Sequence, residues 1–442
     1  MTETTAPADV SADDARAKFA EQRRALPFLR RHGALILLML TFTAAFVDRQ
    51  LLAILQESVK RDLNLTDSQL GLLSGTAFAL FYITFGVPIA RLADLWVRRD
   101  LIAISLAAWS AMTAATGAAQ TFLHVMLARI GVAIGEAGCN PSAYSMITDL
   151  YPPQQRATAT AFFNTGASWG MLLGFLLGGW LEAVVGWRGA FVVVGLPGIL
   201  LALALRFCIK EPPRTAHKEK NTVSFMQGLR FISTKKSLIA LGFGVSFSGT
   251  AAYVPILWGA SYFIRVHELT PAQIGTLLAL ALGLAGAIVS LAVAFCADKV
   301  AARDQRWRLW ILALINLASV PLWALGFLAS DGSSAMTWLF APLAMCNAFS
   351  GIAYALINSI TPATFRATAS AIFLLLANGV GMGIGVLGVG ALSDYLLPTY
   401  GVQSIQYAIL MVVPAAALLA ALSYFWGAAA LRADLEAAEA AQ

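Results

Sequence analysis

Four charged residues lie inside two long apolar stretches of the sequence. Asp48 and Arg49 are neighbours in the first stretch, and Arg129 and Glu136 lie in the second. An ionisable side chain at the depth of a membrane costs about 2.5–3.5 kcal/mol or more, so its retention points to function. Arginine keeps its charge under all ordinary conditions, so only the two carboxyl groups can exchange a proton. We therefore predict that Asp48 and Glu136 take part in proton coupling.

The spacing of these residues limits which of them can pair. Asp48 and Arg49 are adjacent, so on a helix their side chains diverge and do not face each other. Arg129 and Glu136 lie two turns apart on one face of the helix that the second stretch would form. We expect Arg49 to pair with Glu136 across a cavity, or Asp48 to pair with Arg129. A protonation event that alternates with solute or conformation is one interpretation, and a permanent ion-pair network that joins two helices is the other.

The elements that hold these residues are long apolar segments. Of the 442 residues, 59% are hydrophobic and 12% are charged, about half the charge of a soluble domain. This composition excludes a soluble enzyme, and continuous runs of about 20 residues favour membrane helices over barrel strands. The sequence predicts an all-α membrane protein with twelve transmembrane helices, at about 34–56, 69–95, 101–121, 122–150, 157–184, 188–209, 238–265, 271–297, 308–330, 335–360, 367–396 and 402–428.

Lysine and arginine predict the orientation of these helices. Most of the 30 basic residues fall in segments that are cytoplasmic if the N-terminus is inside. The outer loops then hold few, namely Lys60, Arg61, Arg188 and Arg265. Positively charged loops stay in the cytoplasm, so we expect both termini there and the protein in the cell (inner) membrane. The net charge of +6 has the same origin, and we expect no nucleic-acid partner.

Polar segments divide the chain into parts. We expect a disordered cytoplasmic tail, an N-terminal six-helix bundle, a cytoplasmic linker, a C-terminal six-helix bundle and a cytoplasmic tail, at 1–33, 34–209, 210–236, 237–428 and 429–442. Apolar residues in the linker segment 223–234 are compatible with a short interfacial helix, and a plain linker is the alternative. The last tail is rich in Ala and Glu, and could continue the final helix.

Cysteine and histidine, which can bind metals, occur without the spacing that a metal or cofactor site needs. The four cysteines and four histidines are scattered, and no CxxC, HExxH or Walker-type pattern occurs. We therefore expect no metal, no cofactor, no catalytic residues and no enzymatic activity.

The two halves of the chain repeat short motifs in the same order. LTDSQLG at 65–71 opens the second predicted helix, and LTPAQIG at 269–275 opens the eighth. RATATA at 156–161 opens the fifth, and RATASA at 366–371 opens the eleventh. Six helices repeated in parallel resemble the major facilitator superfamily, whose two halves are related by an axis along the membrane normal.

The sequence ARLADLWVRR at 90–99 resembles the superfamily's signature between helices two and three. Ala90 and Val97 stand where that signature has glycine. The resemblance implies a conformational latch that bridges the cytoplasmic ends of helices and stabilises the outward-open state. Its residues would be Asp94, Arg98 and Arg99, with Asp298 and Arg303 as a second copy. A simple positively charged loop is the alternative.

Two further segments resemble the Spinster family of this superfamily. They are AFVDRQLLAIL at 45–55 and ARIGVAIGEAGCNPSAYSMITDLYPPQQRATA at 128–159. The resemblance implies that Asp48, Arg49 and Glu136 face the cavity, and that Arg129 opens the motif in helix four. Animal members of the family export lysophospholipids or sphingosine phosphates. The same segments also resemble the anion:cation symporters of the superfamily, which take up hexuronates and similar organic anions.

The C-terminal half favours an amphiphilic solute over a small carboxylate. Its predicted helices carry no cationic residue inside the spans, and amide and aromatic groups would line its side of the cavity. We expect solute contacts from Arg49, Arg129, Glu136, Tyr354, Asn358 and Asn378, and from the aromatic residues Tyr253, Trp258 and Phe373, which could equally serve packing.

The sequence therefore predicts a secondary active transporter that works by alternating access with proton coupling. Arg49 would hold the head of an amphiphilic anion such as a lysophospholipid, and Asp48 or Glu136 would carry the proton. The alternative is a proton-coupled symporter of hexuronate-like organic anions. We expect a monomer in the lipid bilayer, with protons and a small-molecule or lipid solute as its partners. The tails are too short for the sensory domain of a membrane receptor.

Overall fold

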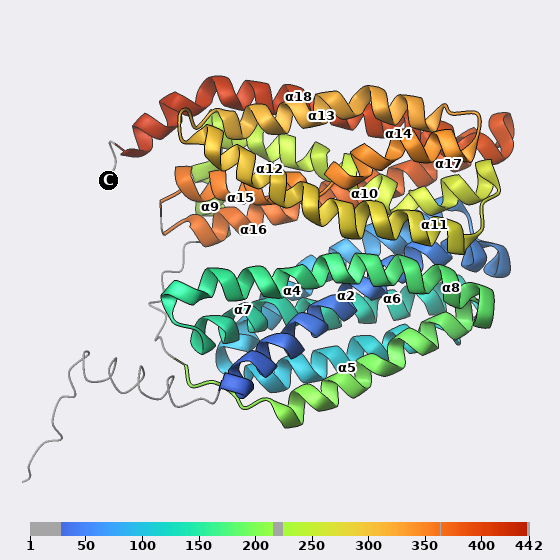
Figure 1. Cartoon of the computed structure of the whole chain (residues 1–442), viewed down its shortest axis with the longest axis horizontal. Helices are drawn as coiled ribbons and strands as arrows, with labels where there is room; N and C mark the ends of the chain where they lie inside the picture. The colour runs from blue at the N-terminus through green and yellow to red at the C-terminus, as the bar shows by residue number, and fades with distance from the viewer. Residues whose placement is uncertain (1–27, 215–223, 363, 440–442) are drawn as a thin grey trace, which may run out of the picture.

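The two halves of the chain fold into two helical bundles that lie side by side (Figure 1). The computed structural model describes residues 28–214, 224–362 and 364–439, and these ranges contain helices and loops but no strand. Most of the predicted tail 1–33 and the middle of the predicted linker lie outside the described residues. Both the start of the first described helix and the end of the last lie at one end of the molecule, which we call the tail end. The opposite end is called the far end.

Eight consecutive elements form the N-terminal bundle. They are α2 (Phe28–Leu63), α3 (Asp67–Gly71), η1 (Leu72–Thr76), α4 (Ala77–Leu95), α5 (Arg98–Thr116), α6 (Phe122–Ala137), α7 (Cys139–Leu150) and α8 (Pro153–Cys208). The predicted helix 69–95 corresponds to α3, η1 and α4, which follow one another directly. Gly186 interrupts α8 with a φ of 69°, between the two helices predicted at 157–184 and 188–209. Glycine adopts positive φ without the steric penalty of other residues, which explains the break.

The C-terminal bundle follows a short linker helix, α9 (Phe225–Ser233). Its elements are α10 (Lys236–His267), α11 (Pro271–Leu278), η2 (Ala279–Ala285), α12 (Gly286–Ala301), α13 (Trp307–Phe327), α14 (Gly332–Met345), α15 (Ala348–Ile360), α16 (Arg366–Leu376), η3 (Ala377–Gly385), α17 (Val386–Tyr400), η4 (Gly401–Gln403) and α18 (Ser404–Glu439). The helix α9 occurs where an interfacial helix was one of two predictions. The helix α18 continues into the predicted C-terminal tail.

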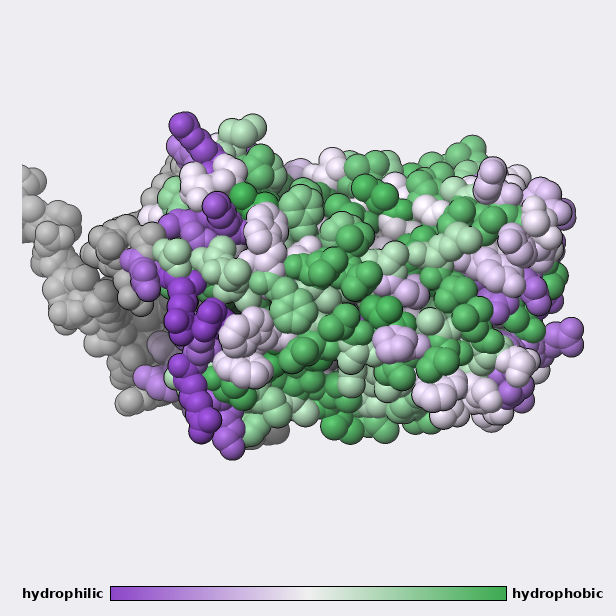
Figure 2. Space-filling model, turned by 90° about the horizontal axis from the view of Figure 1, so that it is seen from above, coloured by the Kyte–Doolittle hydropathy of each residue, from purple (hydrophilic) through white to green (hydrophobic). Residues whose placement is uncertain are grey.

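Nine helices in the described part of the chain are long and apolar enough to cross a membrane. The sequence predicts twelve, and that number stays a prediction. Two of the nine segments, 153–208 and 368–436, each contain two predicted helices without a gap. The helix α5 is not among the nine, and its first residues are Arg98, Arg99 and Asp100. Figure 2 shows the resulting surface, with an apolar belt along the middle and hydrophilic residues gathered at the ends.

Glycines bring the two bundles close together at the far end. A Cβ at Gly179 of α8 would meet the backbone carbonyl of Pro271 at the start of α11. The reciprocal contact lies one turn away, where a Cβ at Gly275 would meet the carbonyl of Phe175. Small residues at such positions let helix backbones approach closely in a membrane.

We expect Gly179→Ala to lower the melting temperature of the purified protein. The added methyl group would push α8 from α11, and such overpacking costs about 1–3 kcal/mol. Gly86→Ala in α4 is the matched control, because a Cβ there meets nothing within 4 Å. Equal melting temperatures for the two variants would contradict the close contact between α8 and α11.

Candidate functional site

An ion pair joins helices α2 and α6 inside the N-terminal bundle. Nε of Arg49 donates a hydrogen bond of 2.8 Å to Oε2 of Glu136, and Nη2 of Arg49 lies 2.6 Å from the same oxygen. Glu136 is 2% exposed, whereas the side chain of Arg49 is 17% exposed. This is one of the two pairings that the sequence suggests. The guanidinium of Arg49 contacts the buried carboxylate of Glu136 and is itself partly exposed.

The second suggested pairing, between Asp48 and Arg129, is not formed. Both residues are buried, but within the described residues no arginine nitrogen lies within 4.0 Å of the Asp48 carboxylate. Oδ2 of Asp48 instead accepts a hydrogen bond of 2.7 Å from the hydroxyl of Thr113 in α5. Nε of Arg129 and Oε1 of Glu136 are buried without a hydrogen-bond partner in the described part of the chain. The cluster therefore contains four ionisable groups and one tight ion pair.

Aromatic rings surround the two arginines. The guanidinium of Arg49 lies over the rings of Phe78, Phe46 and Tyr82, at 4.8, 5.1 and 5.3 Å from their centroids. The guanidinium of Arg129 lies 5.1 Å from the centroid of Phe78. A cation over an aromatic face gains about 0.5–2 kcal/mol, depending on burial. The rings help to keep two largely buried cations in place, and no motif in the sequence singled them out.

Arg49 reaches a cavity of about 560 Å³ between the two bundles. It is the one charged residue among the described side chains that line this cavity. The other walls are apolar, aromatic or uncharged polar residues of both bundles, among them Phe46, Asn164, Ser168, Met171, Tyr253, Ile256, Leu291, Asn347 and Phe349. Asp48, Arg129 and Glu136 do not line the cavity and lie buried in the N-terminal bundle.

A smaller pocket of about 100 Å³ adjoins this cavity in the C-terminal bundle. Tyr253 belongs to both, and its hydroxyl donates a hydrogen bond of 3.0 Å to Oδ1 of Asn378. Tyr354 also lines the smaller pocket. Two other residues suggested by the sequence lie elsewhere: Asn358 is exposed on α15, and Trp258 is buried and donates to the carbonyl of Val386.

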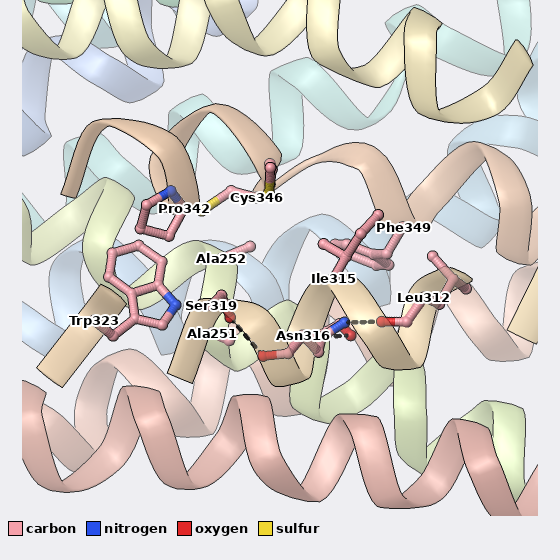
Figure 3. Close-up of a pocket in the computed structure, with 12 residues that line it drawn as sticks. Ala251, Ala252, Leu312, Ile315, Asn316, Ser319, Trp323, Pro342, Cys346 and Phe349 are labelled. Carbon is pink, nitrogen blue, oxygen red and sulfur yellow. Dashed lines mark hydrogen bonds between the residues drawn. The ribbon is translucent and has the colours of Figure 1, made fainter. Parts of the chain in front are cut away.

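A third pocket lies within the C-terminal bundle, where residues of α10, α13 and α14 line it (Figure 3). Its volume of about 30 Å³ is enough for a water molecule. Asn316 and Ser319, whose side chains line it, bond to backbone carbonyls of their own helix, at 2.9 and 2.7 Å. Trp323 and Cys346 complete an uncharged wall. These contacts serve local packing and identify no solute.

The residues of the first predicted latch lie at the tail end, within the N-terminal half. Arg98 is buried and bonds to Asp149 at 2.5 Å and to Glu211 at 2.7 Å. Arg99 pairs with Asp100 at 2.7 Å. The backbone carbonyl of Asp94 accepts a hydrogen bond from Arg214. These contacts fix the start of α5 against α7 and the segment after α8.

The second predicted latch lies at the tail end of the C-terminal bundle. Asp298 pairs with Arg308 at 3.2 Å, and the backbone N–H of Arg303 donates to the carbonyl of Val300. Nearby, Asp304 accepts two hydrogen bonds from the side chain of Arg306. Together with a backbone hydrogen bond, they hold the pKa of Asp304 at about 2. This carboxylate therefore stays ionised throughout the physiological pH range.

An ion-pair network that the sequence analysis missed joins the bundles at the far end. Arg265, at the end of α10, donates four hydrogen bonds of 2.7–2.9 Å to Glu57 and Asp67. Glu57 is 4% exposed and Asp67 is 1% exposed. Within the described residues, these are the ion pairs that connect the two bundles. One signal was available: LTDSQLG carries Asp67 where its repeat carries Pro271.

Other polar contacts support the same far-end junction. Asp394 of α17 accepts hydrogen bonds from the backbone N–H groups of Asp67 and Ser68, at 2.9 and 2.7 Å. Gln56 of α2 donates to the carbonyl of Leu257 and the hydroxyl of Ser261 in α10, both at 2.7 Å. The two bundles are thus held together by buried polar contacts near the far end.

Comparison with known proteins identifies the relatives of this chain. The model of the Major Facilitator Superfamily matches residues 37–386. An MFS-type efflux pump of Mycolicibacterium smegmatis is 31% identical, over 92% of this chain and 96% of that protein. A probable L-galactonate transporter of Escherichia coli strain K12 is 29% identical over 38% of this chain and 37% of that protein.

A solved structure resembles the whole fold. It is the crystal structure of a bacterial homolog to the human lysosomal transporter Spinster, in an inward-facing and unoccupied conformation. The TM-score is 0.82 at 28% sequence identity, and the match covers 93% of this chain and 99% of that chain. The chain therefore belongs to the Major Facilitator Superfamily, as a multi-pass inner-membrane transporter that resembles the Spinster proteins.

Proposed function

We propose that this transporter moves an amphiphilic anion by alternating access and couples the movement to protons. One observation carries the proposal: a buried cluster of two carboxyl groups and two guanidinium groups stands behind a cavity whose other walls are uncharged. The cluster can bind a charge and exchange a proton. The cavity walls can accommodate a hydrocarbon chain.

Arg49 would bind the anionic head of the solute. Its Nε and Nη2 are engaged by Glu136, but a guanidinium has five N–H donors, so further donors remain for a ligand. Arg129, whose Nε has no hydrogen-bond partner among the described residues, would add positive charge behind it. Tyr253, Tyr354 and Asn378 would contact the solute in the adjoining pocket. A lysophospholipid or sphingolipid-like solute has a charged head for Arg49 and an apolar chain for the uncharged walls. The similarity to a Spinster structure supports such a solute.

Asp48 would carry the proton. Its carboxyl group is buried and lacks an arginine within 4.0 Å in the described part of the chain, so no ion pair holds it permanently ionised. Glu136 is tightly paired with Arg49 and is the second candidate. Binding of an anion at Arg49 would weaken that pair, and so would couple solute binding to protonation within one cluster.

A hexuronate-like organic anion is the alternative solute. Asn164, Ser168 and Asn347 line the cavity and supply hydrogen-bond partners for the hydroxyl groups of such a solute. The partial similarity to an L-galactonate transporter supports this candidate. The apolar and aromatic residues that make up most of the wall favour the amphiphile.

Transport into proteoliposomes distinguishes the two solutes. Purified protein would be reconstituted, and movement of radiolabelled lysophosphatidylglycerol, an anionic lysolipid, and of radiolabelled glucuronate would be measured with and without a pH gradient. We expect the gradient to drive the lysolipid and not glucuronate. Gradient-driven transport of glucuronate alone would support the alternative, and no gradient-dependent transport of either solute would contradict the proposal.

We further propose that the tail end is cytoplasmic and that this structure is the state open to the cytoplasm. The buried contacts at the far end support it, as does the similarity to an inward-facing structure. In the opposite state, the latch residues Asp94, Arg98 and Arg99 would approach the other bundle, as would Asp298 and Arg303. The Arg265 network would then have to separate.

We expect Arg265→Gln to open the far end. The variant leaves Glu57 and Asp67 without their shared cation, and two buried carboxylates then repel each other. Spin labels at Gln120 in the N-terminal bundle and Val402 in the C-terminal bundle would report the separation by electron–electron double resonance. The distance distribution should shift to longer values.

Arg188→Gln is the matched control for this experiment. Arg188 also lies at the far end, but its ion pair with Asp62 stays within the N-terminal bundle. We expect this variant to keep the original distance distribution. Identical distributions for Arg265→Gln and the unmodified protein would contradict a gating role for Arg265.

A further inference from the structure

Thr113 of α5 is the hydrogen-bond partner that the structure gives to Asp48. Its Oγ1 lies 2.7 Å from Oδ2 of Asp48, and the two residues are 2% and 4% exposed. The two come from different helices, α5 and α2. No other hydrogen bond to the Asp48 carboxyl occurs within the described residues. The orientation of this carboxyl group therefore depends on one hydroxyl group.

No charged group near Asp48 contacts its carboxyl group directly, so Thr113 alone orients it among the described residues. The charged groups that act on Asp48 are Arg49 on its own helix α2, and Arg129 and Glu136 on α6. Arg49 is engaged by Glu136, and Arg129 forms no ion pair with Asp48. These groups act on Asp48 only through space. The threonine hydroxyl makes the direct contact.

A hydroxyl group suits a carboxyl group that gains and loses a proton. It donates its hydrogen to a carboxylate, and it accepts a hydrogen from a protonated carboxyl group. Lysine or arginine in the same place would stabilise only the ionised form. Thr113 can thus remain in contact with Asp48 in both protonation states.

We propose that Thr113 is the positioning residue for proton exchange at Asp48 and helps to set the pH at which transport operates. The inference rests on the proposed function, in which Asp48 carries the proton. Hydrogen bonds to the charged form of an acid favour that form. Removing the hydroxyl group therefore makes the ionised form harder to reach.

Transport of labelled lysophosphatidylglycerol at a series of pH values tests the inference. Thr113→Val keeps the shape of the side chain and removes the hydroxyl, and we expect its pH profile to move to higher pH by about one unit. Thr113→Ser should restore the original profile. Thr116→Val is the matched control, because Thr116 is also buried in α5 but donates to the carbonyl of Met112.

The outcomes separate this inference from the proposed function. If Asp48→Asn keeps the pH dependence of the unmodified protein, the proposed role of Asp48 is wrong. If Asp48→Asn abolishes that dependence while folded Thr113→Val keeps the original profile, only the inference about Thr113 is overturned. Should Thr113→Val fail to fold, Thr113→Ala removes the same hydroxyl. The infrared band of the protonated carboxyl, followed over the same pH series, gives a second readout without transport.

Discussion

Asp48→Asn is expected to abolish transport against a concentration gradient while leaving the protein folded. A one-unit pH gradient coupled to one proton can drive about tenfold accumulation, because 1.4 kcal/mol corresponds to a factor of ten. Asparagine has nearly the same shape as aspartate but cannot exchange a proton. Accumulation of labelled lysophospholipid in proteoliposomes should therefore fall from about tenfold to none, whereas exchange without a gradient should persist.

Asp62→Asn is the control for this prediction. Asp62 also lies on α2, but it is at the far end, where it accepts hydrogen bonds from Trp187 and Arg188. Removal of its charge should leave gradient-driven accumulation intact. Full accumulation by folded Asp48→Asn would show that the proton is carried elsewhere.

Arg49→Gln is expected to destabilise the protein and to abolish transport. The variant leaves Glu136 ionised and buried without its partner, and breaking one side of a buried ion pair costs about 3–5 kcal/mol. It also removes the charged group that reaches the cavity. The melting temperature in detergent and binding of labelled lysophospholipid would measure the two effects separately.

The double variant Arg49→Gln with Glu136→Gln separates stability from function. Neutralising both partners removes the uncompensated charge, so the double variant should recover most of the lost stability. It should still fail to bind the solute, because the cation is absent. Binding by the double variant would contradict the role of Arg49, and a melting temperature that stays low would contradict the importance of the ion pair.

Much of the fold follows from the sequence because membrane helices are long and apolar. The predicted helix at 238–265 corresponds to α10, and that at 308–330 corresponds to α13. The pairing of Arg49 with Glu136 was one of two suggestions, because adjacent residues on a helix cannot face each other. The division at Gly186 was also predictable, since Glu182, Gly186, Arg188 and Gly189 interrupt the apolar run there.

The contacts between helices are harder to predict from sequence. Thr113 is one of many hydroxyl residues in apolar segments, and only packing shows that it faces Asp48. Arg265 lies near a helix end, where a basic residue is expected to contact water. Its four hydrogen bonds depend on two carboxylates from the other half of the chain, distant in sequence. The repeat singles out Asp67, but no local sequence pattern pairs it with Arg265.

Proton movement that accompanies solute movement tests the central proposal most directly. Proteoliposomes would contain a pH-sensitive dye, and lysophosphatidylglycerol would be added outside without an imposed pH gradient. The account predicts a change in internal pH that requires the solute, is absent for Asp48→Asn and persists for Asp62→Asn. Solute transport by the unmodified protein with no change in internal pH would contradict proton coupling.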